Sequence, residues 1–574
     1  MEKIIKDRIN IWLSGAYDEE AKAEIRAMQN NAPNELIDAF YKDLEFGTGG
    51  LRGIMGVGTN RMNKYTVAMA TQGLSNYVKT QTKKQKPSVV IAYDSRNNSY
   101  YFSEITAEVL SANGFQVYLF DKITPTPELS FAIRHLQCDT GIVITASHNP
   151  KEYNGYKVYW SDGGQLVPPH DNNVIEEVQK IKSIAEVNFQ RNEKLITYIG
   201  EEIDKPYLEK IKSLSMHLEV IQRQKDLKIV YTPLHGTGVY MVPRALRMFG
   251  FENISLVEAQ AVPDGNFPTV KSPNPEEVEA MTMALKQAKA IDADIILATD
   301  PDADRIGVAV KKADGEYELL NGNMTLSLLV YYMLQEWKTK GKINGNQYVV
   351  KTVVTTELVR DMAVKEGVEC IDVLTGFKYI AEKLLQYEGK KEFIAGGEES
   401  FGCLVGDFVR DKDAVISCAV LAELAAVAKE EGKTLYDVLI DIYLKYGFYK
   451  EHLISITRKG LQGAEEIQQM MYTFRSSPPA MINGSKVVKI NDILLSKCTD
   501  LSKNTSTAID LPKSDVLQFF LEDGSKITVR PSGTEPKIKF YFSVKESLSK
   551  REDFAAVNEK LSNKINNIVK AIEL

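Results

Sequence analysis

Short hydrophobic runs with high β-propensity recur along the chain in three sets of three, and the third run of each set ends in a polar loop. Helical patterns such as SEITAEVLSANG and PEEVEAMTMALKQAKA separate the runs, so each set predicts a βαβα unit with a mostly parallel sheet. Near-continuous apolar runs are typical of buried parallel strands. The runs are 89–94, 116–121, 141–150, 228–236, 254–260, 294–305, 348–356, 369–374 and 392–402.

The three polar loops occupy equivalent positions in their sets. They read TASHNP (145–150), DPDADR (300–305) and GGEESFG (396–402). In open α/β sheets, ligands bind beyond the carboxyl ends of the strands. Three equivalent units that each offer one such loop therefore predict a shared central cleft.

The last part of the chain has a different pattern. Residues 516–544 alternate between hydrophobic and polar around a turn at Asp523-Gly524, and an amphipathic helix is expected over roughly 552–572. A fourth polar loop, RPSGTEPK (530–537), lies between two of the expected strands. We therefore expect an α/β protein with three related mixed α/β domains and a smaller C-terminal α+β domain around a central cleft. The predicted domains are 1–208, 209–323, 324–450 and 451–574.

Composition and charge exclude several classes of protein. The 574 residues are 44% hydrophobic and 26% charged, which is typical of a soluble globular chain and not of a disordered or fibrous one. The 77 acidic residues outnumber the 70 basic ones and give a net charge of −7, which argues against a dedicated nucleic-acid-binding protein. An anionic substrate must then be held by local basic pockets.

Cysteine usage and hydropathy predict a cytoplasmic protein with no membrane partner. The five cysteines are scattered and include no CxxC pair, so a disulfide framework and a structural zinc site are both excluded. Charges interrupt the sequence MEKIIKDRINIWL, which is unlike a secretory signal. The most apolar stretches, 326–334 and 418–428, are far shorter than the about 20 residues that cross a bilayer.

The loop DPDADR brings three carboxylates together after a buried strand, on Asp300, Asp302 and Asp304. Close like charges repel one another unless a hard cation lies between them, and a set of oxygen ligands suits Mg²⁺ or Ca²⁺. An EF-hand would need glycine at its sixth position and glutamate at its twelfth, where this loop has Arg305 and Lys311. The strand-end position favours a metal site over a solvated acidic turn.

The loop TASHNP contains adjacent serine and histidine residues. Ser147 could be a nucleophile or a capping residue, and a lone pair such as Ser147 and His148 is more often structural than catalytic. No GxSxG elbow occurs in the sequence, which disfavours an α/β-hydrolase. Lys157 in NGYK could bind a phosphate or transfer a proton.

The loop RPSGTEPK is dense in groups that bind anions. An arginine, two hydroxyls and a lysine lie around a glycine that exposes backbone N–H groups, which favours a phosphate cradle over a surface hairpin. These residues are Arg530, Ser532, Gly533, Thr534 and Lys537.

Two glycine-rich loops offer groups for a sugar phosphate. Glu398 and Ser400 follow two glycines, and a fixed carboxylate and hydroxyl suit sugar hydroxyls better than a general-acid role. The segment EFGTGGLRG (45–53) is neither GxGxxG nor a P-loop, and it predicts a flexible loop that brings Arg52 to an anion.

Together these motifs resemble those of the α-D-phosphohexomutase family, the phosphoglucomutase and phosphomannomutase enzymes. Four signature loops occur in the family's order, namely TASHNP, DPDADR, GEESFG and RPSGTEP. Each loop alone is weak to moderate, but four in order are very specific and cover nearly the whole chain. The segment EFGTGGLRGIMG, followed by NRMN, is similar to the branch that includes phosphopentomutases and glucose 1,6-bisphosphate synthases.

The resemblance implies a role for each matching residue. Ser147 would carry a phosphoryl group, and Mg²⁺ would bind to an oxygen of this group and to Asp300, Asp302 and Asp304. Lys157 or His148 would be the proton-transfer partner. The basic residues near the phosphoserine would be Arg52, His148, Lys157 and Arg305. The sugar would be contacted by Glu398, Ser400 and Lys378. The phosphate that is not transferred would be held by Arg530, Ser532, Gly533 and Thr534.

The activity that the resemblance implies is the reversible interconversion of glucose 1-phosphate and glucose 6-phosphate, with glucose 1,6-bisphosphate as activator and intermediate. GEESFG resembles the glucose-preferring sugar loop, so phosphoglucomutase activity, with some activity on mannose, ranks before phosphopentomutase activity. A metal-dependent phosphatase and a non-catalytic sugar-phosphate-binding homologue are rivals, although a binder would need neither Ser147 nor the aspartates. The expected partner is a small sugar phosphate, and the expected assembly is a monomer or homodimer.

Overall fold

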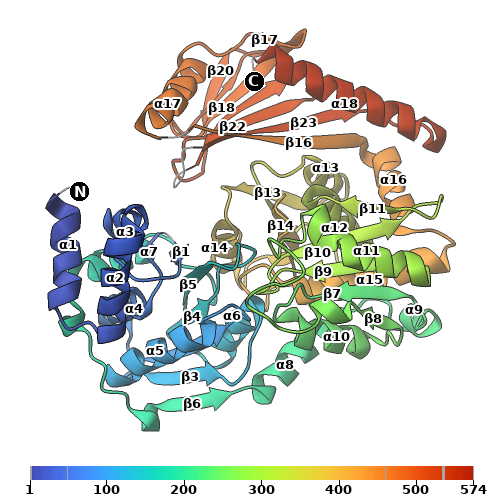
Figure 1. Cartoon of the computed structure of the whole chain (residues 1–574). Coiled ribbons are helices and arrows are strands. Elements are labelled where there is room, and N and C mark those ends of the chain that lie inside the picture. The colour runs from blue at the N-terminus through green and yellow to red at the C-terminus, as the bar shows by residue number, and fades with distance from the viewer. Residues whose placement is uncertain (1–2, 48, 459, 533–536, 573–574) are drawn as a thin grey trace. The chain divides into compact units, whose positions relative to one another are not determined.

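The computed structural model describes residues 3–47, 49–458, 460–532 and 537–572 (Figure 1). The contacts among Cα atoms divide the chain into two units. The first, called unit 1, comprises Met1–Asn321, Phe377–Ala395 and Phe401–Thr434. The second, called unit 2, comprises Gly322–Gly376, Gly396–Ser400 and Leu435–Leu574. The boundaries of the four expected domains stay a prediction.

The first sheet of unit 1 has six strands in the order β1-β5-β4-β2-β3-β6. β2 is parallel to β3 and β4, as the apolar runs predict, and every residue of β2 and β4 is buried. β5 is antiparallel to both β4 and β1, so one edge of the sheet departs from the parallel pattern. The strands are β1 (Gly50–Ile54), β2 (Ser88–Tyr93), β3 (Gln116–Phe120), β4 (Thr140–Ile144), β5 (Tyr153–Trp160) and β6 (Ile196–Ile199).

The part of the glycine-rich segment that carries Arg52 belongs to strand β1, so the expectation of a flexible loop is wrong there. β1 pairs with β5 in a register that places Arg52 opposite Gly155. The glycines that suggest a loop permit this close pairing, because a Cβ atom on Gly50 would lie 1.8 Å from the carbonyl oxygen of Tyr156. Arg52 is therefore carried by a paired strand.

Helices cover the first sheet, and further helices precede it in the chain. α5 and α6 contact the strands, and α4 packs against α5 and α7. The N-terminal helices pack around Trp12, whose ring stacks on Tyr17 at 4.3 Å and meets Phe40 edge-on at 5.5 Å. The helices are α1 (Lys3–Ser14), α2 (Glu19–Asn31), α3 (Pro33–Phe40), α4 (Lys64–Gln81), α5 (Ser99–Ala112), α6 (Thr126–His135) and α7 (His170–Lys180).

The second sheet of unit 1 has five strands in the order β11-β10-β9-β7-β8. β9 lies between the parallel strand β7 and the antiparallel strand β10, so the loop DPDADR is the turn that joins β9 to β10. The strands are β7 (Ile229–Thr232), β8 (Ile254–Leu256), β9 (Ile295–Thr299), β10 (Ile306–Lys311) and β11 (Tyr317–Leu320). The helices with this sheet are α8 (Glu201–Lys212), α9 (Leu218–Arg223), α10 (Gly238–Phe249), α11 (Val278–Ile291) and α15 (Ala414–Glu430).

The third set of strands is divided between the units. β12 and β13 form a parallel pair in unit 2, where α12 packs against α13 and α16. β14 begins in unit 1 and ends in unit 2 at the loop GEESFG. The elements of unit 2 are α12 (Gly322–Thr339), β12 (Gln347–Thr352), α13 (Leu358–Lys365), β13 (Glu369–Val373) and α16 (Leu435–Tyr446). The others are α14 (Phe377–Tyr387), β14 (Glu392–Gly397) and β15 (Cys403–Val405).

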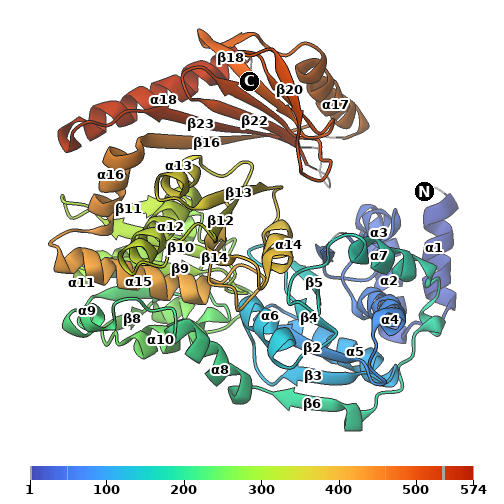
Figure 2. The same ribbon diagram turned by 180° about the vertical axis from the view of Figure 1, so that it is seen from behind.

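The C-terminal sheet of unit 2 is antiparallel and has eight strands, in the order β16-β23-β22-β21-β18-β19-β20 with β17 paired to β18 (Figure 2). The strands are β16 (Phe448–Thr457), β17 (Met481–Ile482), β18 (Ser485–Asp492), β19 (Lys497–Asp500), β20 (Thr505–Ala508), β21 (Leu517–Leu521), β22 (Lys526–Pro531) and β23 (Lys537–Glu546). The helices are α17 (Gly460–Ser476) and α18 (Phe554–Ala571), the latter close to the expected tail helix.

The two faces of the C-terminal sheet differ in character. On the apolar face, the ring of Phe540 lies 6.1 Å from Phe474 of α17, and Phe448 lies 4.9 Å from Phe554, which begins α18. Because side chains alternate along a strand, the opposite face of β22 and β23 carries polar residues. These residues are Lys526, Thr528, Arg530 and Tyr541.

The sheets and helices confirm the expected fold class of three α/β units followed by an α+β unit. In the parts of the chain that the structure describes, no helix is long and apolar enough to cross a membrane.

Candidate active site

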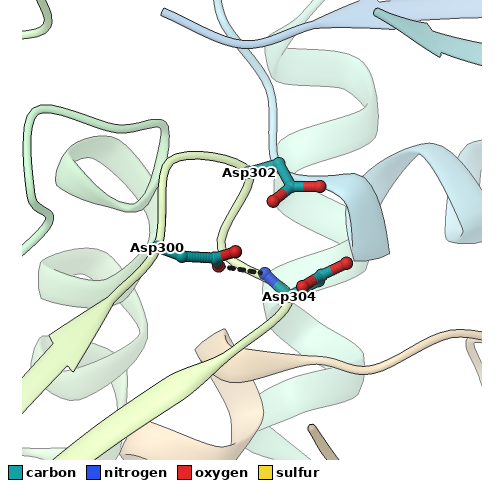
Figure 3. A group of neighbouring side chains, drawn as sticks. All are labelled: Asp300, Asp302 and Asp304. Atoms are coloured by element: carbon teal, nitrogen blue, oxygen red, sulfur yellow. Dashed lines mark hydrogen bonds between the residues drawn. The ribbon is translucent and has the colours of Figure 1, made fainter. Parts of the chain in front are cut away.

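The turn between β9 and β10 gathers the three aspartates of DPDADR (Figure 3). Asp300, Asp302 and Asp304 are all buried, and each offers a carboxylate oxygen within 4.8 Å of the others. The turn is fixed from within, because the backbone N–H groups of Asp304 and Arg305 donate to Asp300 Oδ1 at 3.1 and 3.0 Å. The expected grouping of the three carboxylates is therefore present in the structure.

The charges of this turn fit a bound cation. Burial, followed by the charges of Asp302 and Asp304, raises the pKa of Asp300 well above its usual range. Among the described residues, Asp302 Oδ1 and Asp304 Oδ1 are buried atoms with no hydrogen-bond partner. A hard divalent cation would supply the partner that these oxygens lack and would offset the repulsion. The donor set thus fits Mg²⁺.

Ser147 lies at this turn although it belongs to the first sheet. It follows β4 in a left-handed backbone conformation with φ of 52°, and only 3% of it is exposed. Its Oγ donates to Asp300 Oδ2 at 2.5 Å and lies 3.1 Å from His148 Nδ1. The structure therefore brings the serine of TASHNP and the first aspartate of DPDADR into direct contact.

Two residues absent from the sequence-based site hold the serine loop. The guanidinium of Arg96 donates to the carbonyl oxygen of Ser147 at 2.5 Å, and to the carbonyl oxygens of Asn149, Pro150 and Tyr153. Its buried partner is Asp94, at 3.4 Å. The only signal in the sequence is the position of YDSR at the end of strand β2.

Asp94 reaches the serine by a second route. The hydroxyl of Thr145 donates to Asp94 Oδ2 at 2.6 Å and accepts from the backbone N–H of Ser147 at 2.9 Å. Both backbone groups of Ser147 are thus tied to one buried ion pair. This explains how a non-glycine residue keeps a positive φ at this position.

We expect Arg96→Leu to lower the free energy of unfolding by about 3–5 kcal/mol, because it leaves Asp94 buried without its cation. Arg96→Lys should recover part of this loss, since it restores a charge without the fork of donors. Urea unfolding followed by circular dichroism measures both, with Arg247→Lys on the exposed face of α10 as the matched control. An unchanged midpoint for Arg96→Leu would contradict this account.

Lysines surround the aspartates. Lys157 on β5 donates to Asp302 Oδ2 at 2.7 Å and to Asp304 Oδ2 at 3.2 Å. Lys412, which lies in none of the sequence motifs, is 3.2 Å from Asp304 Oδ2 and 2.8 Å from Asp411 Oδ1. Burial opposes the charged form of Asp304, but Lys157, Lys412 and Arg305 outweigh it and lower the pKa of Asp304.

His148 is neutral in this setting. Burial, followed by the charges of Arg305 and Arg52, lowers the pKa of His148 to about 2. By contrast, burial opposes the charge on Lys157, but Asp302 and Asp304 outweigh it and raise the pKa of Lys157. The two expected proton-transfer residues therefore differ, because the imidazole of His148 is a weak base here whereas Lys157 keeps its proton.

The two arginines expected near the serine are both in unit 1. Arg52 on β1 is exposed, and its Nη1 lies 3.4 Å from Asn149 Oδ1. Arg305 lies 3.1 Å from Glu276 Oε1. Lys378, at the start of α14, lies 3.4 Å from Asp171 Oδ2 in the same unit.

Apart from Lys378, the expected sugar and phosphate ligands belong to unit 2. Glu398, which is 8% exposed, accepts from the backbone N–H of Gly376 at 2.8 Å, and Ser400 follows in the same loop. Arg530 lies near the end of β22, and the N–H of Ser532 donates to the carbonyl oxygen of Lys537 at 2.7 Å. Gly533 and Thr534 lie outside the described residues.

Models of four protein domains match the chain in order. They are phosphoglucomutase/phosphomannomutase α/β/α domain I at residues 43–185, domain II at 205–315, domain III at 321–446 and the C-terminal domain at 481–560.

Two staphylococcal proteins are similar over nearly the whole chain. A phosphoglucomutase of Staphylococcus aureus strain MRSA252 is 39% identical over 538 residues, which are 93% of this chain and 95% of the relative. A phosphoglucomutase of Staphylococcus haemolyticus is 39% identical over 509 residues, which are 88% of this chain and 91% of the relative.

Solved structures share the fold at lower identity. The open form of pp63/parafusin, a phosphoglucomutase from Paramecium, is 18% identical with a TM-score of 0.68, over 92% of this chain and 96% of the other. A phosphoglucomutase/phosphomannomutase family protein from Burkholderia thailandensis is 19% identical with a TM-score of 0.63, over 92% and 97%.

Proposed function

Because the chain belongs to the phosphoglucomutase/phosphomannomutase family, we propose that it interconverts glucose 1-phosphate and glucose 6-phosphate. The observation that carries this proposal is the contact of Ser147 Oγ with Asp300 in a buried turn of three aspartates. A serine that only capped a helix or turn would not need three buried carboxylates beside it.

The reaction consists of two phosphoryl transfers. Phosphorylated Ser147 gives its phosphoryl group to the 6-hydroxyl of glucose 1-phosphate, so the bond from phosphorus to Ser147 Oγ breaks as the bond to the sugar oxygen forms. The 6-hydroxyl loses its proton in this step, and Ser147 Oγ gains one. The product, glucose 1,6-bisphosphate, turns over and returns its 1-phosphoryl group to Ser147 Oγ, which leaves glucose 6-phosphate. In-line positioning and charge neutralisation are the main tasks of the protein.

The residues of unit 1 divide these tasks. Mg²⁺ bound by Asp300, Asp302, Asp304 and the phosphoserine would neutralise charge on the phosphoryl group. The proton-transfer partner would be Lys157 or His148, and His148 Nδ1 lies 3.1 Å from Ser147 Oγ. Charged Lys157, Arg52 and Arg305 stabilise the anionic groups around the serine.

The matching motifs of the family assign the residues that would hold the substrate. Glu398, Ser400 and Lys378 bind the sugar hydroxyls, and Arg530 and Ser532 bind the phosphate that is not transferred, as would Gly533 and Thr534. Both ends of glucose 1,6-bisphosphate are anionic, so a second phosphate site is required in either orientation.

Glucose ranks before the alternatives. The relatives that cover most of the chain carry the name phosphoglucomutase, which favours a hexose over a pentose. Some activity on mannose phosphates follows from the family. We also propose a cytoplasmic monomer or homodimer, and light scattering on the purified protein would distinguish the two.

Phosphorus NMR on the purified protein tests the proposed activity. The assay contains Mg²⁺ and a trace of glucose 1,6-bisphosphate. We expect the phosphate to migrate to the 6-hydroxyl faster in glucose 1-phosphate than in mannose 1-phosphate. Ribose 1-phosphate should react most slowly. Release of inorganic phosphate would indicate a phosphatase, and no change with any sugar would indicate a binding protein. Faster migration on ribose would favour a phosphopentomutase.

A further inference from the structure

The second glutamate of the loop GEESFG has no part in the reaction proposed above. Glu399 Oε2 accepts from Thr352 Oγ1 at 3.1 Å and from Thr355 Oγ1 at 3.2 Å, and the two hydroxyls lie 2.8 Å apart. Both threonines are fully buried. These three contacts share only two hydroxyl protons. The threonines alone would leave one proton without an acceptor, and the charged carboxylate of Glu399 supplies a strong one.

The two threonines belong to the segment 352–357, which forms ion pairs and hydrogen bonds with buried lysines. Lys351 Nζ lies 3.0 Å from Glu357 Oε1 and 2.9 Å from Asp372 Oδ1, and it is within 3.4 Å of the carbonyl oxygens of Thr352 and Thr355. Burial opposes ionisation of Glu357, but Lys351 and Lys526 outweigh it and hold the pKa of Glu357 well below its usual range. The segment 352–357 is therefore fixed by charge within unit 2.

Side chains of the C-terminal sheet bind the same segment. Lys526 on β22 lies 2.5 Å from Glu357 Oε1 and 3.1 Å from the carbonyl oxygen of Val353, to which Gln518 on β21 also donates at 2.8 Å. The face of the sheet that carries Lys526 also carries Thr528 and Arg530, because side chains two residues apart on a strand lie on the same face. The strand that carries the phosphate-binding arginine thus also fixes the threonines that hold Glu399.

We propose that Glu399 is a positioning residue, which ties the sugar loop to the segment 352–357 and so fixes the adjacent Glu398 and Ser400 for the sugar hydroxyls. This inference rests on the proposed function. The two hydrogen bonds from Thr352 and Thr355 to Glu399 carry this inference.

The test compares Glu399→Ala with Glu399→Gln and Thr355→Val. Glu399→Ala should raise KM for glucose 1-phosphate about 10-fold and change kcat less than about 3-fold, because the loop binds substrate less well while the phosphoserine is untouched. Glu399→Gln keeps an acceptor oxygen for the hydroxyls and should recover most of the KM. Inhibition by inorganic phosphate, which has no sugar hydroxyls for the loop to bind, should be unchanged in all three variants.

Thr355→Val should raise KM in the same direction, and the double variant Glu399→Ala with Thr355→Val should be less than additive. Glu392→Ala, at the exposed start of β14, is the matched control. An unchanged KM in Glu399→Ala would overturn the inference, as would an equal loss in Glu399→Gln, which would make Glu399 a direct ligand of the sugar.

The two proposals fail in different ways. If the unaltered protein converts none of the sugar phosphates, the proposed function fails and this inference fails with it. The unaltered protein could instead be active while the effects of Glu399→Ala and Thr355→Val are non-additive only in the midpoint of urea unfolding and not in KM. The contact would then be structural, and this inference alone would be overturned.

Discussion

Ser147→Ala is expected to lower the rate of interconversion by on the order of 10⁴-fold or more, because it removes the oxygen that carries the phosphoryl group between the two sugar positions. The fold should persist, since the backbone of Ser147 remains tied to Arg96 and Thr145. Mutase activity is measured with glucose 1-phosphate, Mg²⁺ and glucose 1,6-bisphosphate. The melting temperature is measured on the same sample.

Labelling makes this prediction independent of turnover. Glucose 1,6-bisphosphate carrying labelled phosphorus should transfer the label to the unaltered protein and not to Ser147→Ala. Ser213→Ala, at the exposed end of α8, is the matched control and should label and turn over normally. Label on Ser147→Ala, or a mutase rate above about one tenth of normal, would contradict the role of Ser147.

The sequence predicted those parts of the fold that depend on local pattern. β2, β4 and β9 are continuous apolar runs, because both faces of a parallel strand are buried, and each can be found in the sequence. β1 could not be found in this way, because GLRGI contains two glycines and only its pairing with β5 makes it a strand. Local propensity is overridden there by tertiary contact.

The same distinction applies to the site. The aspartates of DPDADR are neighbours in sequence, so their grouping could be predicted from spacing alone. The contact of Ser147 with Asp300 spans 153 residues. The rule that ligands bind at strand ends predicted only a shared cleft, and the pairing of this serine with the aspartates came from the family resemblance. Arg96 and Lys412 lie in no motif and act through contacts with other segments. Glu399 lies in GEESFG, but the motif does not reveal its contact with Thr352 and Thr355.

Asp302→Asn is the sharpest test of the metal site, because this substitution can keep every hydrogen bond that the structure gives Asp302. Oδ2 accepts from Lys157 at 2.7 Å and from Thr126 Oγ1 at 2.8 Å, and an amide oxygen can take its place. The amide nitrogen would then replace Oδ1, the buried oxygen without a hydrogen-bond partner among the described residues. A nitrogen that carries two hydrogens cannot bind Mg²⁺, so the variant loses the metal ligand and one negative charge but none of these hydrogen bonds. Lys157 keeps Asp304 as its ionic partner, at 3.2 Å.

We therefore expect Asp302→Asn to raise the Mg²⁺ concentration for half-maximal activity at least about 10-fold and to lower kcat about 10²-fold or more. Mg²⁺ should also raise the melting temperature of the unaltered protein, because a ligand that binds only the folded state stabilises it, and this gain should shrink in Asp302→Asn. Asp226→Asn, at an exposed position, should behave as the unaltered protein. Identical Mg²⁺ titrations for the three proteins, by rate and by melting temperature, would remove Asp302 from the metal site. Since the variant keeps its contacts with Lys157 and Thr126, a weakened response to Mg²⁺ without a lower melting temperature in its absence would assign the loss to the metal and not to the fold.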